Sequence, residues 1–173
     1  LYMRDAYAAM GDEGVTAFRY VDWILTVPLM CVEFYLILQK AGAPKSLLWN
    51  LIGLSTVMLV TGYVGEAGIG NAAFWGGVSG VAYFIICYIL WFGSAGELAN
   101  KAGGAVLECF TALKWFVLVG WAIYPIGYMA GTEGWYSGVF GGLDGSMQLI
   151  YNVGDAINKI GFGLVIYNLA VAK

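Results

Sequence analysis

Five long apolar stretches constrain the fold of this chain more than any other feature. They cover roughly residues 18–38, 46–66, 71–93, 106–130 and 147–172, and each reaches the length of about 20 residues that a helix needs to cross a bilayer. Of the 173 residues, 61% are hydrophobic and 11% are charged, whereas soluble domains are about 45–50% apolar and about 25% charged. Because backbone polar groups in lipid must be satisfied within their own segment, we predict an all-α membrane bundle that forms one domain over residues 1–173.

The segments between these stretches are short and more polar. They are residues 7–17, which we predict as an entry loop, and links 39–45, 67–70, 94–105 and 131–146. Lysines lie in links 39–45 and 94–105 and after the last stretch, whereas 7–17 and 131–146 carry acidic residues without Lys or Arg. The positive-inside rule therefore places links 39–45 and 94–105 in the cytoplasm of a multi-pass membrane protein.

The composition also excludes several classes of function. The net charge of −3 leaves no basic face for nucleic acid, and the chain has no histidine. Cys31, Cys87 and Cys109 are scattered through apolar runs without a CxxC pair. We therefore expect neither a metal site nor a Ser-His-Asp triad, and we do not expect an enzyme.

Ionisable groups at membrane depth are costly, and they mark functional sites by default. Three ionisable residues, Glu66, Glu108 and Lys114, lie near the ends of their stretches, where long side chains can reach the membrane interface. They are therefore less informative about function than those nearer the middle. The five that stand out are Arg19, Asp22, Glu33, Asp155 and Lys159.

The first stretch carries two of these acids on one face. At about 100° per residue, Thr26 lies about 40° from Asp22, and Glu33 lies only about 20° from it. The two carboxylates are roughly 16 Å apart along the helix axis. That separation is too large for a shared-proton pair, but it suits two stations on a proton path.

The last stretch places Asp155 and Lys159 at i and i+4, on one face of an apolar helix. A structural ion pair that balances buried charge is one interpretation. The other is functional, because buried lysines form imines with carbonyl compounds. Asp22 and Asp155 would then face two cations, Arg19 and a protonated imine, in a neutral set.

Aromatic residues of the fourth stretch offer a wall for a flat ligand. Trp121, Tyr124 and Tyr128 lie near one face of that helix, and Trp23 belongs to the first stretch. Helix packing alone explains many such stripes. Together with a buried lysine, however, this stripe favours a conjugated aldehyde as the ligand.

These residues together resemble the microbial rhodopsins. The motifs are Arg19-Tyr20-Val21-Asp22-Trp23, Leu25-Thr26-Val27-Pro28, Trp121-xx-Tyr124-Pro125 and Asp155-xxx-Lys159, and the segments around Glu33-Phe34-Tyr35 and residues 62–68 are similar to the proteorhodopsin and xanthorhodopsin branch. The resemblance implies a seven-transmembrane-helix bundle in a prokaryotic cell membrane. We expect this chain to comprise the end of the second helix, at Leu1–Arg4, and five complete helices.

The resemblance also implies a cofactor and a role for each residue. All-trans-retinal would be bound to Lys159 as a Schiff base, with Asp22 as counterion and proton acceptor, Asp155 as second counterion, Arg19 beside them and Glu33 as proton donor. Membrane lipid and further copies of the chain are the expected partners. Similarity places the following residues around the retinal: Tyr20, Trp23, Thr26, Met30, Met58, Gly62, Ser79, Gly80, Tyr83, Trp121, Tyr124, Pro125, Tyr128 and Asn158.

The set Asp22, Thr26 and Glu33 is typical of light-driven outward proton pumps of this family. A sensory rhodopsin that signals through a transducer protein is the alternative, and a small transporter without a chromophore is a third hypothesis. The proton-release glutamates of bacteriorhodopsin-like pumps have no evident match in this chain.

Two positions bear on colour and on a second pigment. Met30 occupies the colour-tuning position, where an apolar side chain should favour green absorption. Gly76 stands where bacteriorhodopsin-like pumps have a tryptophan. It therefore predicts either a window for a carotenoid antenna or simply close helix packing.

Overall fold

The computed structural model describes residues 2–140, 142 and 144–171, and this part of the chain is a bundle of helices. Leu1, Ala172 and Lys173, on which the expected helix tail, the end of the last stretch and part of the orientation argument rest, lie outside the described residues. The elements in chain order are α1 (Tyr2–Leu38), η1 (Gln39–Ala41), α2 (Lys45–Glu66), α3 (Ala72–Trp91), α4 (Ser94–Ala102), α5 (Gly104–Trp115), η2 (Phe116–Gly120), α6 (Ile123–Gly131), α7 (Ser137–Phe140) and α8 (Asp144–Val171).

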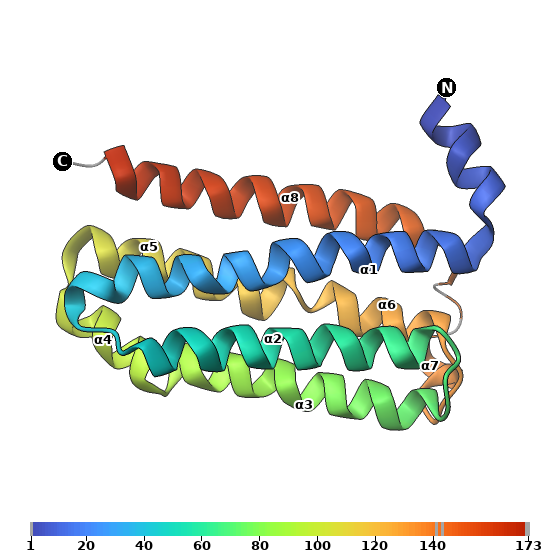
Figure 1. The fold of residues 1–173 in the computed structure, drawn as a ribbon, viewed down its shortest axis with the longest axis horizontal. Helices are drawn as coiled ribbons and strands as arrows, with labels where there is room; N and C mark the ends of the chain where they lie inside the picture. Colours follow the sequence, from blue (N-terminus) through green and yellow to red (C-terminus); the bar gives the residue numbers. More distant parts are fainter. Residues whose placement is uncertain (1, 141, 143, 172–173) are drawn as a thin grey trace.

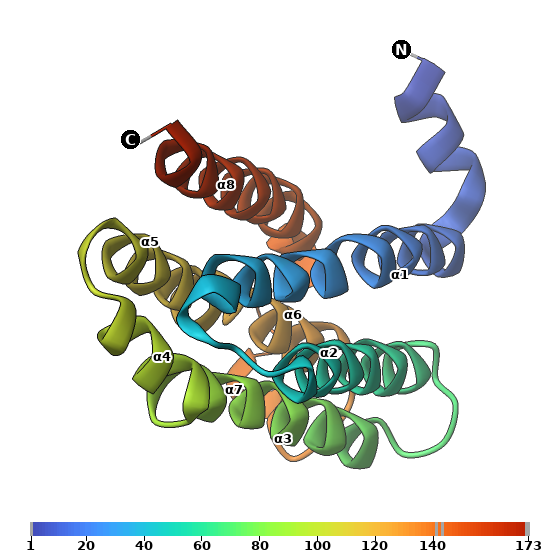
Figure 2. The same cartoon turned by 60° about the vertical axis from the view of Figure 1, so that its left-hand side comes forward.

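The long helices lie side by side along the long axis of the molecule, and α5 and α6 follow each other almost end to end (Figure 1). Helix α2 packs against both α1 and α3, and α8 packs against α5 and α6. The view in Figure 2 shows α1 between α8 and α2. Within the described residues, five helical segments are long and apolar enough to cross a membrane: Gly14–Ala41, Lys45–Glu66, Ala72–Ala102, Gly104–Gly131 and Leu149–Val171.

The predicted entry loop over residues 7–17 is wrong. The chain is helical from Tyr2 to Leu38 except at Gly11, whose φ of 67° and ψ of 174° turn the first helical segment away from the bundle (Figure 1). The polar composition of residues 7–17 limits how deeply this segment can lie in lipid, but it does not prevent the segment from forming a helix. Two predicted links also contain helices, namely α4 within 94–105 and α7 within 131–146.

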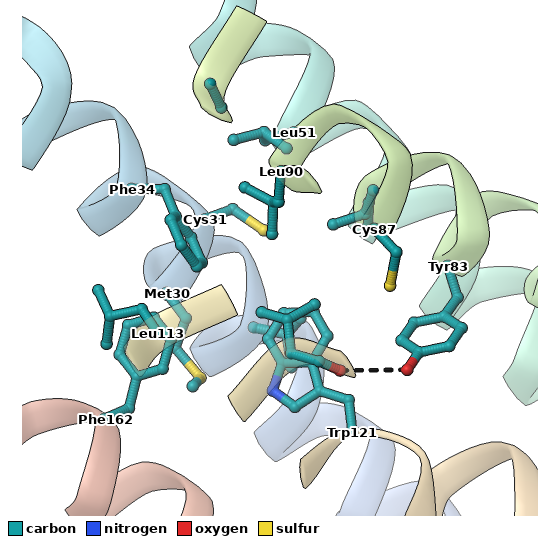
Figure 3. Packing of buried hydrophobic residues seen from close by; sticks show 14 of the residues in the cluster. Met30, Cys31, Phe34, Leu51, Tyr83, Cys87, Leu90, Leu113, Trp121 and Phe162 are labelled. Atoms are coloured by element: carbon teal, nitrogen blue, oxygen red, sulfur yellow. Dashed lines mark hydrogen bonds between the residues drawn. The ribbon is translucent and has the colours of Figure 1, made fainter. Parts of the chain in front are cut away.

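Apolar side chains of α1, α2, α3, α5 and α8 meet in the interior of the bundle (Figure 3). Phe34 of α1 meets Phe110 of α5 and Phe162 of α8 edge to face, with ring centroids 5.6 Å apart in both pairs. All three rings, together with Leu113, are no more than 1% exposed. Such edge-to-face pairs stabilise packing beyond the area that they bury.

The fourth spanning segment is interrupted by one π-helical turn, η2. Pro125, inside the helix α6 that follows, has no N–H to donate to the carbonyl of Trp121, four residues earlier. The amide of Trp121 instead donates to the carbonyl of Phe116, five residues back, at 3.0 Å. The regular hydrogen-bond pattern of the fourth spanning segment is therefore broken on the N-terminal side of Pro125.

Two buried side chains bind the carbonyls of this turn. The hydroxyl of Tyr83 donates to the carbonyls of Val117 and Leu118 at 3.1 and 2.7 Å, and the amide of Asn158 donates to the carbonyl of Gly120 at 2.9 Å. A Cβ at Gly120 would overlap the Asn158 amide oxygen. The turn is thus held from α3 on one side and from α8 on the other.

The hydrogen bond of Asn158 should contribute measurably to stability. Asn158→Ala leaves the Gly120 carbonyl without this donor, so we expect the free energy of unfolding to fall by about 1–3 kcal/mol. Unfolding in detergent micelles, followed by circular dichroism, measures the change. Asn152→Ala is the matched control, because Asn152 is an exposed residue of the same helix, and its effect should stay within about 0.5 kcal/mol. Equal losses in both variants would contradict this account.

Candidate functional site

Lys159 of α8 lies between two carboxylates. The amino group of Lys159 donates a hydrogen bond to Asp22 of α1, and it pairs with Asp155, one turn earlier on α8, at 2.6 Å. The hydroxyl of Tyr124 on α6 donates to the second oxygen of Asp155 at 2.7 Å. Asp22 and Lys159 are 137 positions apart in the sequence. Together with Asp155, these residues singled out from the sequence are therefore in direct contact.

This cluster is only partly enclosed by the described part of the chain. The side chains of Lys159, Asp22 and Asp155 are 28%, 46% and 19% exposed. Thr26 donates to the backbone carbonyl of Asp22 at 3.0 Å, so its hydroxyl supports the helix at the level of the carboxylate. The carboxylate of Asp22 is consequently held by Lys159 of α8, whereas the hydrogen bond from Thr26 is to its backbone carbonyl within α1.

Glu33 lies on the same helix as Asp22, at some distance from the cluster. It is half-buried, and the buried side chains that α1 places between Asp22 and Glu33 include Val27, Met30 and Cys31, all apolar. The two acids are thus separated by an apolar segment, as two stations on a proton path would be. The role of Glu33 as a donor remains a prediction.

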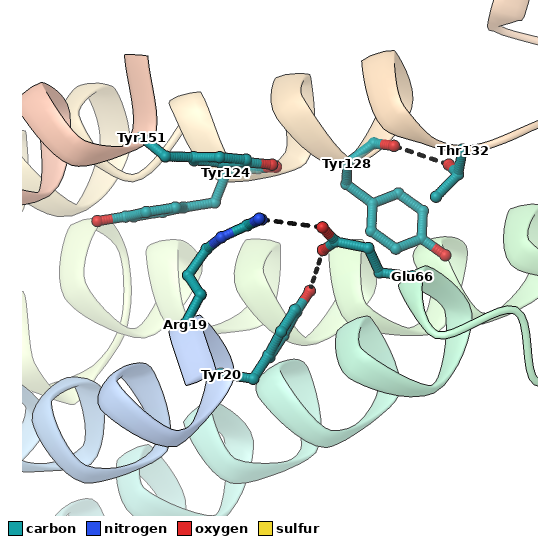
Figure 4. A network of polar contacts seen from close by, with 7 residues as sticks. All are labelled: Arg19, Tyr20, Glu66, Tyr124, Tyr128, Thr132 and Tyr151. Atoms are coloured by element: carbon teal, nitrogen blue, oxygen red, sulfur yellow. Dashed lines mark hydrogen bonds and ion pairs between the residues drawn. The ribbon is translucent and has the colours of Figure 1, made fainter. Parts of the chain in front are cut away.

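Arg19 pairs with Glu66, a residue that its place near the end of an apolar stretch made less informative. Its guanidinium contacts the carboxylate of Glu66, the last residue of α2, at 2.9 Å, and Tyr20 donates to the other oxygen of Glu66, also at 2.9 Å (Figure 4). The side chains of Arg19 and Glu66 are only 11% and 14% exposed. The guanidinium also lies over the ring of Tyr151, 4.5 Å from its centroid.

One feature of the sequence indicates that Glu66 faces the site. Gly62, which we predict in the retinal pocket, lies four residues before Glu66 on α2, and residues at i and i+4 share a helix face. The position of Glu66 near the end of an apolar stretch indicated that its side chain reaches the membrane interface. The structure instead buries it against α1.

A cavity of about 450 Å³ opens beside the cluster, between α1, α2, α3 and α6. Its volume falls in the range of about 300–1,000 Å³ that is typical of small-ligand sites, and its lining is largely apolar and aromatic. Eleven of the fourteen residues predicted around the retinal line it: Tyr20, Trp23, Met58, Gly62, Ser79, Gly80, Tyr83, Trp121, Tyr124, Pro125 and Tyr128.

Three of the predicted pocket residues, Thr26, Met30 and Asn158, do not line the cavity, and their contact with a ligand remains a prediction. Lys159 does not line it either. Trp23 and Tyr124 connect the two regions, because both line the cavity, their rings meet at 4.8 Å, and Tyr124 also binds Asp155. An elongated apolar ligand with an aldehyde end fits this arrangement of an apolar chamber next to a lysine.

The space beside Gly76 is filled by Tyr128. A Cβ at Gly76 would lie 2.5 Å from a carbon of the Tyr128 ring, and a Cβ at Gly65 would overlap the Tyr128 hydroxyl. That hydroxyl donates to the carbonyl of Ala72 at 2.6 Å. Both glycines therefore let α2 and α3 receive the tyrosine of α6, which is the packing interpretation of Gly76.

Known proteins resemble this chain over its whole length. A family model described as "Bacteriorhodopsin-like protein" matches residues 1–173. The green-light absorbing proteorhodopsin of Gamma-proteobacterium EBAC31A08 is 44% identical over 175 residues, which cover 100% of this chain and 68% of that protein.

Two solved structures share the fold. The blue light-absorbing proteorhodopsin from Med12 matches with a TM-score of 0.75 and 39% identity over 98% of this chain and 73% of its own. Xanthorhodopsin, titled a light-driven ion pump with dual chromophore, matches with a TM-score of 0.71 and 33% identity over 90% of this chain and 62% of its own. The chain therefore belongs to the bacteriorhodopsin-like family, with the seven-helix rhodopsin fold, and within it to the proteorhodopsin branch of the microbial rhodopsins.

Proposed function

We propose that this protein is a light-driven outward proton pump that carries all-trans-retinal on Lys159 as a protonated Schiff base. The observation that carries the proposal is the contact of Lys159 with two carboxylates beside an aromatic cavity. When bound, retinal would supply the absorption of visible light and a change of shape at the lysine nitrogen. The remaining chemistry belongs to the side chains of this chain.

Asp22 is the acceptor in this mechanism. Its carboxylate contacts Lys159 Nζ directly, so a proton can move from Nζ to Asp22 without an intervening group. Asp155 is held by the hydroxyl of Tyr124, and it serves as the second counterion of the lysine nitrogen. Two acids with different hydrogen-bond partners can thus play different roles.

The direction of transport follows from where the second acid lies. Glu33 is on the side of link 39–45, which its lysines place in the cytoplasm. Returning a proton from Glu33 to Nζ, after Nζ has given one to Asp22, moves charge from the cytoplasmic side to the side of Arg19 and Glu66. The pump is therefore outward.

The likeness to xanthorhodopsin, a light-driven ion pump with dual chromophore, supports the prediction of a carotenoid antenna. In this chain, the ring of Tyr128 occupies the space beside Gly76. A second pigment at that position would need Tyr128 to move. The geometry supports the packing role of Gly76, and the antenna remains a prediction.

The acceptor can be tested in cells that express the protein and receive all-trans-retinal. Illumination should acidify the medium, and an uncoupler should abolish the signal. Asp22→Asn should keep visible absorbance but lose transport, because a neutral amide cannot accept the proton. Glu97→Gln, which removes an exposed carboxylate on α4, should pump normally. Sustained pumping by Asp22→Asn would sink the assignment, and visible absorbance that survives Lys159→Ala would exclude Lys159 as the attachment site.

The donor role of Glu33 separates a pump from a sensor. Glu33→Gln should slow reprotonation of the lysine nitrogen roughly 10²-fold, because general acid groups contribute about 10²–10⁴-fold to proton transfer. Flash photolysis at neutral pH measures this step. Glu108→Gln, which changes an exposed acid of α5, is the control and should leave the rate unchanged. An unaltered rate in Glu33→Gln would favour the sensory alternative.

A further inference from the structure

Lys114 is an ionisable residue at membrane depth that the proposed pump does not use. It lies on α5, ten residues after Gly104, where that helix begins on the cytoplasmic side. The spanning segment Gly104–Gly131 has 28 residues and is about 42 Å long, whereas the hydrocarbon core of a bilayer is about 30 Å thick. With the segment centred in this core, the Cα of Lys114 lies roughly 9 Å below the cytoplasmic boundary.

The ammonium group of Lys114 packs on an aromatic ring. Its Nζ lies 4.1 Å from the centroid of the Trp91 ring, at the last residue of α3. Trp115 meets Trp91 edge to face, with ring centroids 4.7 Å apart. Among the residues that the structure describes, the salt bridges involve Arg19 and Lys159, and none includes Lys114. This cation is therefore not paired with a carboxylate of the described chain.

The surroundings of Lys114 face the membrane and its cytoplasmic interface. The neighbouring aromatic side chains Tyr88, Phe92 and Trp115 are exposed on the surface of the bundle. Helical side chains lean toward the N-terminus of their helix, so Lys114 leans toward the cytoplasmic end of α5, as lysines near a membrane interface do. Basic pockets between spanning helices on this side of a membrane bind acidic lipid headgroups.

We propose that Lys114 and Trp91 form a site for the headgroup of an anionic phospholipid in the cytoplasmic leaflet. The indole ring holds the ammonium by cation–π attraction, and the lipid phosphate supplies the negative charge that pairs with it. The carboxylates of Asp22, Asp155 and Glu66 pair inside their own bundle, so a second copy of the chain does not offer them to this cation. The inference depends neither on retinal nor on proton transport.

The test is native mass spectrometry of the protein in detergent micelles that contain equal amounts of phosphatidylglycerol and phosphatidylcholine with the same acyl chains. The natural protein should retain more phosphatidylglycerol than phosphatidylcholine. Lys114→Gln should lower this ratio about fivefold, the effect expected of one basic residue near an anionic membrane surface. Equal retention of the two lipids by the natural protein, or an unchanged ratio in Lys114→Gln, would overturn the proposal.

Matched variants separate a site from general surface charge. Lys45→Gln removes an exposed lysine at the cytoplasmic start of α2 and should change the ratio less than twofold. Lys114→Arg keeps a cation that stacks on aromatic rings and should retain the preference. Trp91→Leu removes the ring and should lower the ratio, which keeps the test decisive where circular dichroism shows that Lys114→Gln folds poorly. Equal losses in Lys45→Gln and Lys114→Gln would mean that surface charge alone attracts the lipid, contrary to the proposal.

Two further measurements address other occupants of the site. Inorganic phosphate, added against sodium chloride of equal ionic strength, should not displace phosphatidylglycerol, because the site takes the phosphate of a membrane lipid. Displacement would indicate a site for free phosphate and would contradict the lipid assignment. The mass of the oligomer should be the same in Lys114→Gln as in the natural protein. A smaller oligomer with an unchanged lipid ratio would assign Lys114 to a contact between copies of the chain.

Discussion

The pairing of one lysine with two carboxylates across α1 and α8 is the interaction on which the rest of the structure depends. An ionised group inside a membrane protein is costly unless it is paired and hydrogen-bonded. Asp22 and Lys159 can satisfy each other only if α1 and α8 lie side by side with these residues at one level. Tyr124 then places α6 against the same cluster through Asp155, so the aromatic wall of the cavity is positioned by the charges that it adjoins.

The spanning helices and the pair Asp155–Lys159 could be predicted from the sequence because each depends on spacing within one segment. The approach of Asp22 to Lys159 was predicted through the resemblance to the microbial rhodopsins. Apolar length predicts a span, and helical periodicity predicts that Asp155 and Lys159 share a face. The contact between Arg19 and Glu66 could not be predicted in this way, because depth along one helix does not specify which neighbour it meets. Gly11 and η2 were missed for a related reason: a φ of 67° and a π-turn are backbone choices that apolar patterning does not report.

The two sides of the lysine cluster differ in a way that suits vectorial transfer in the proposed pump. On the side of Glu66, charged and hydroxyl groups follow one another at hydrogen-bond distance, from Arg19 to Glu66 and Tyr20. On the side of Glu33, α1 buries only apolar side chains before the acid is reached, and the aromatic rings around Phe34 close the bundle there. A resting barrier on one side and a polar path on the other give a proton a preferred exit.

Contacts that do not involve charge also fix the depth and rotation of α8. Asn158 donates to the carbonyl of Gly120 in the π-turn, and Gly154 leaves room for Ile123, whose side chain a Cβ there would overlap. These two contacts fasten one face of α8 to the interrupted fourth span. Since successive residues of a helix are about 100° apart, fixing Asn158 toward η2 directs Lys159 to the adjacent face, where α1 presents Asp22. The π-turn η2 is therefore part of how the lysine meets its acceptor.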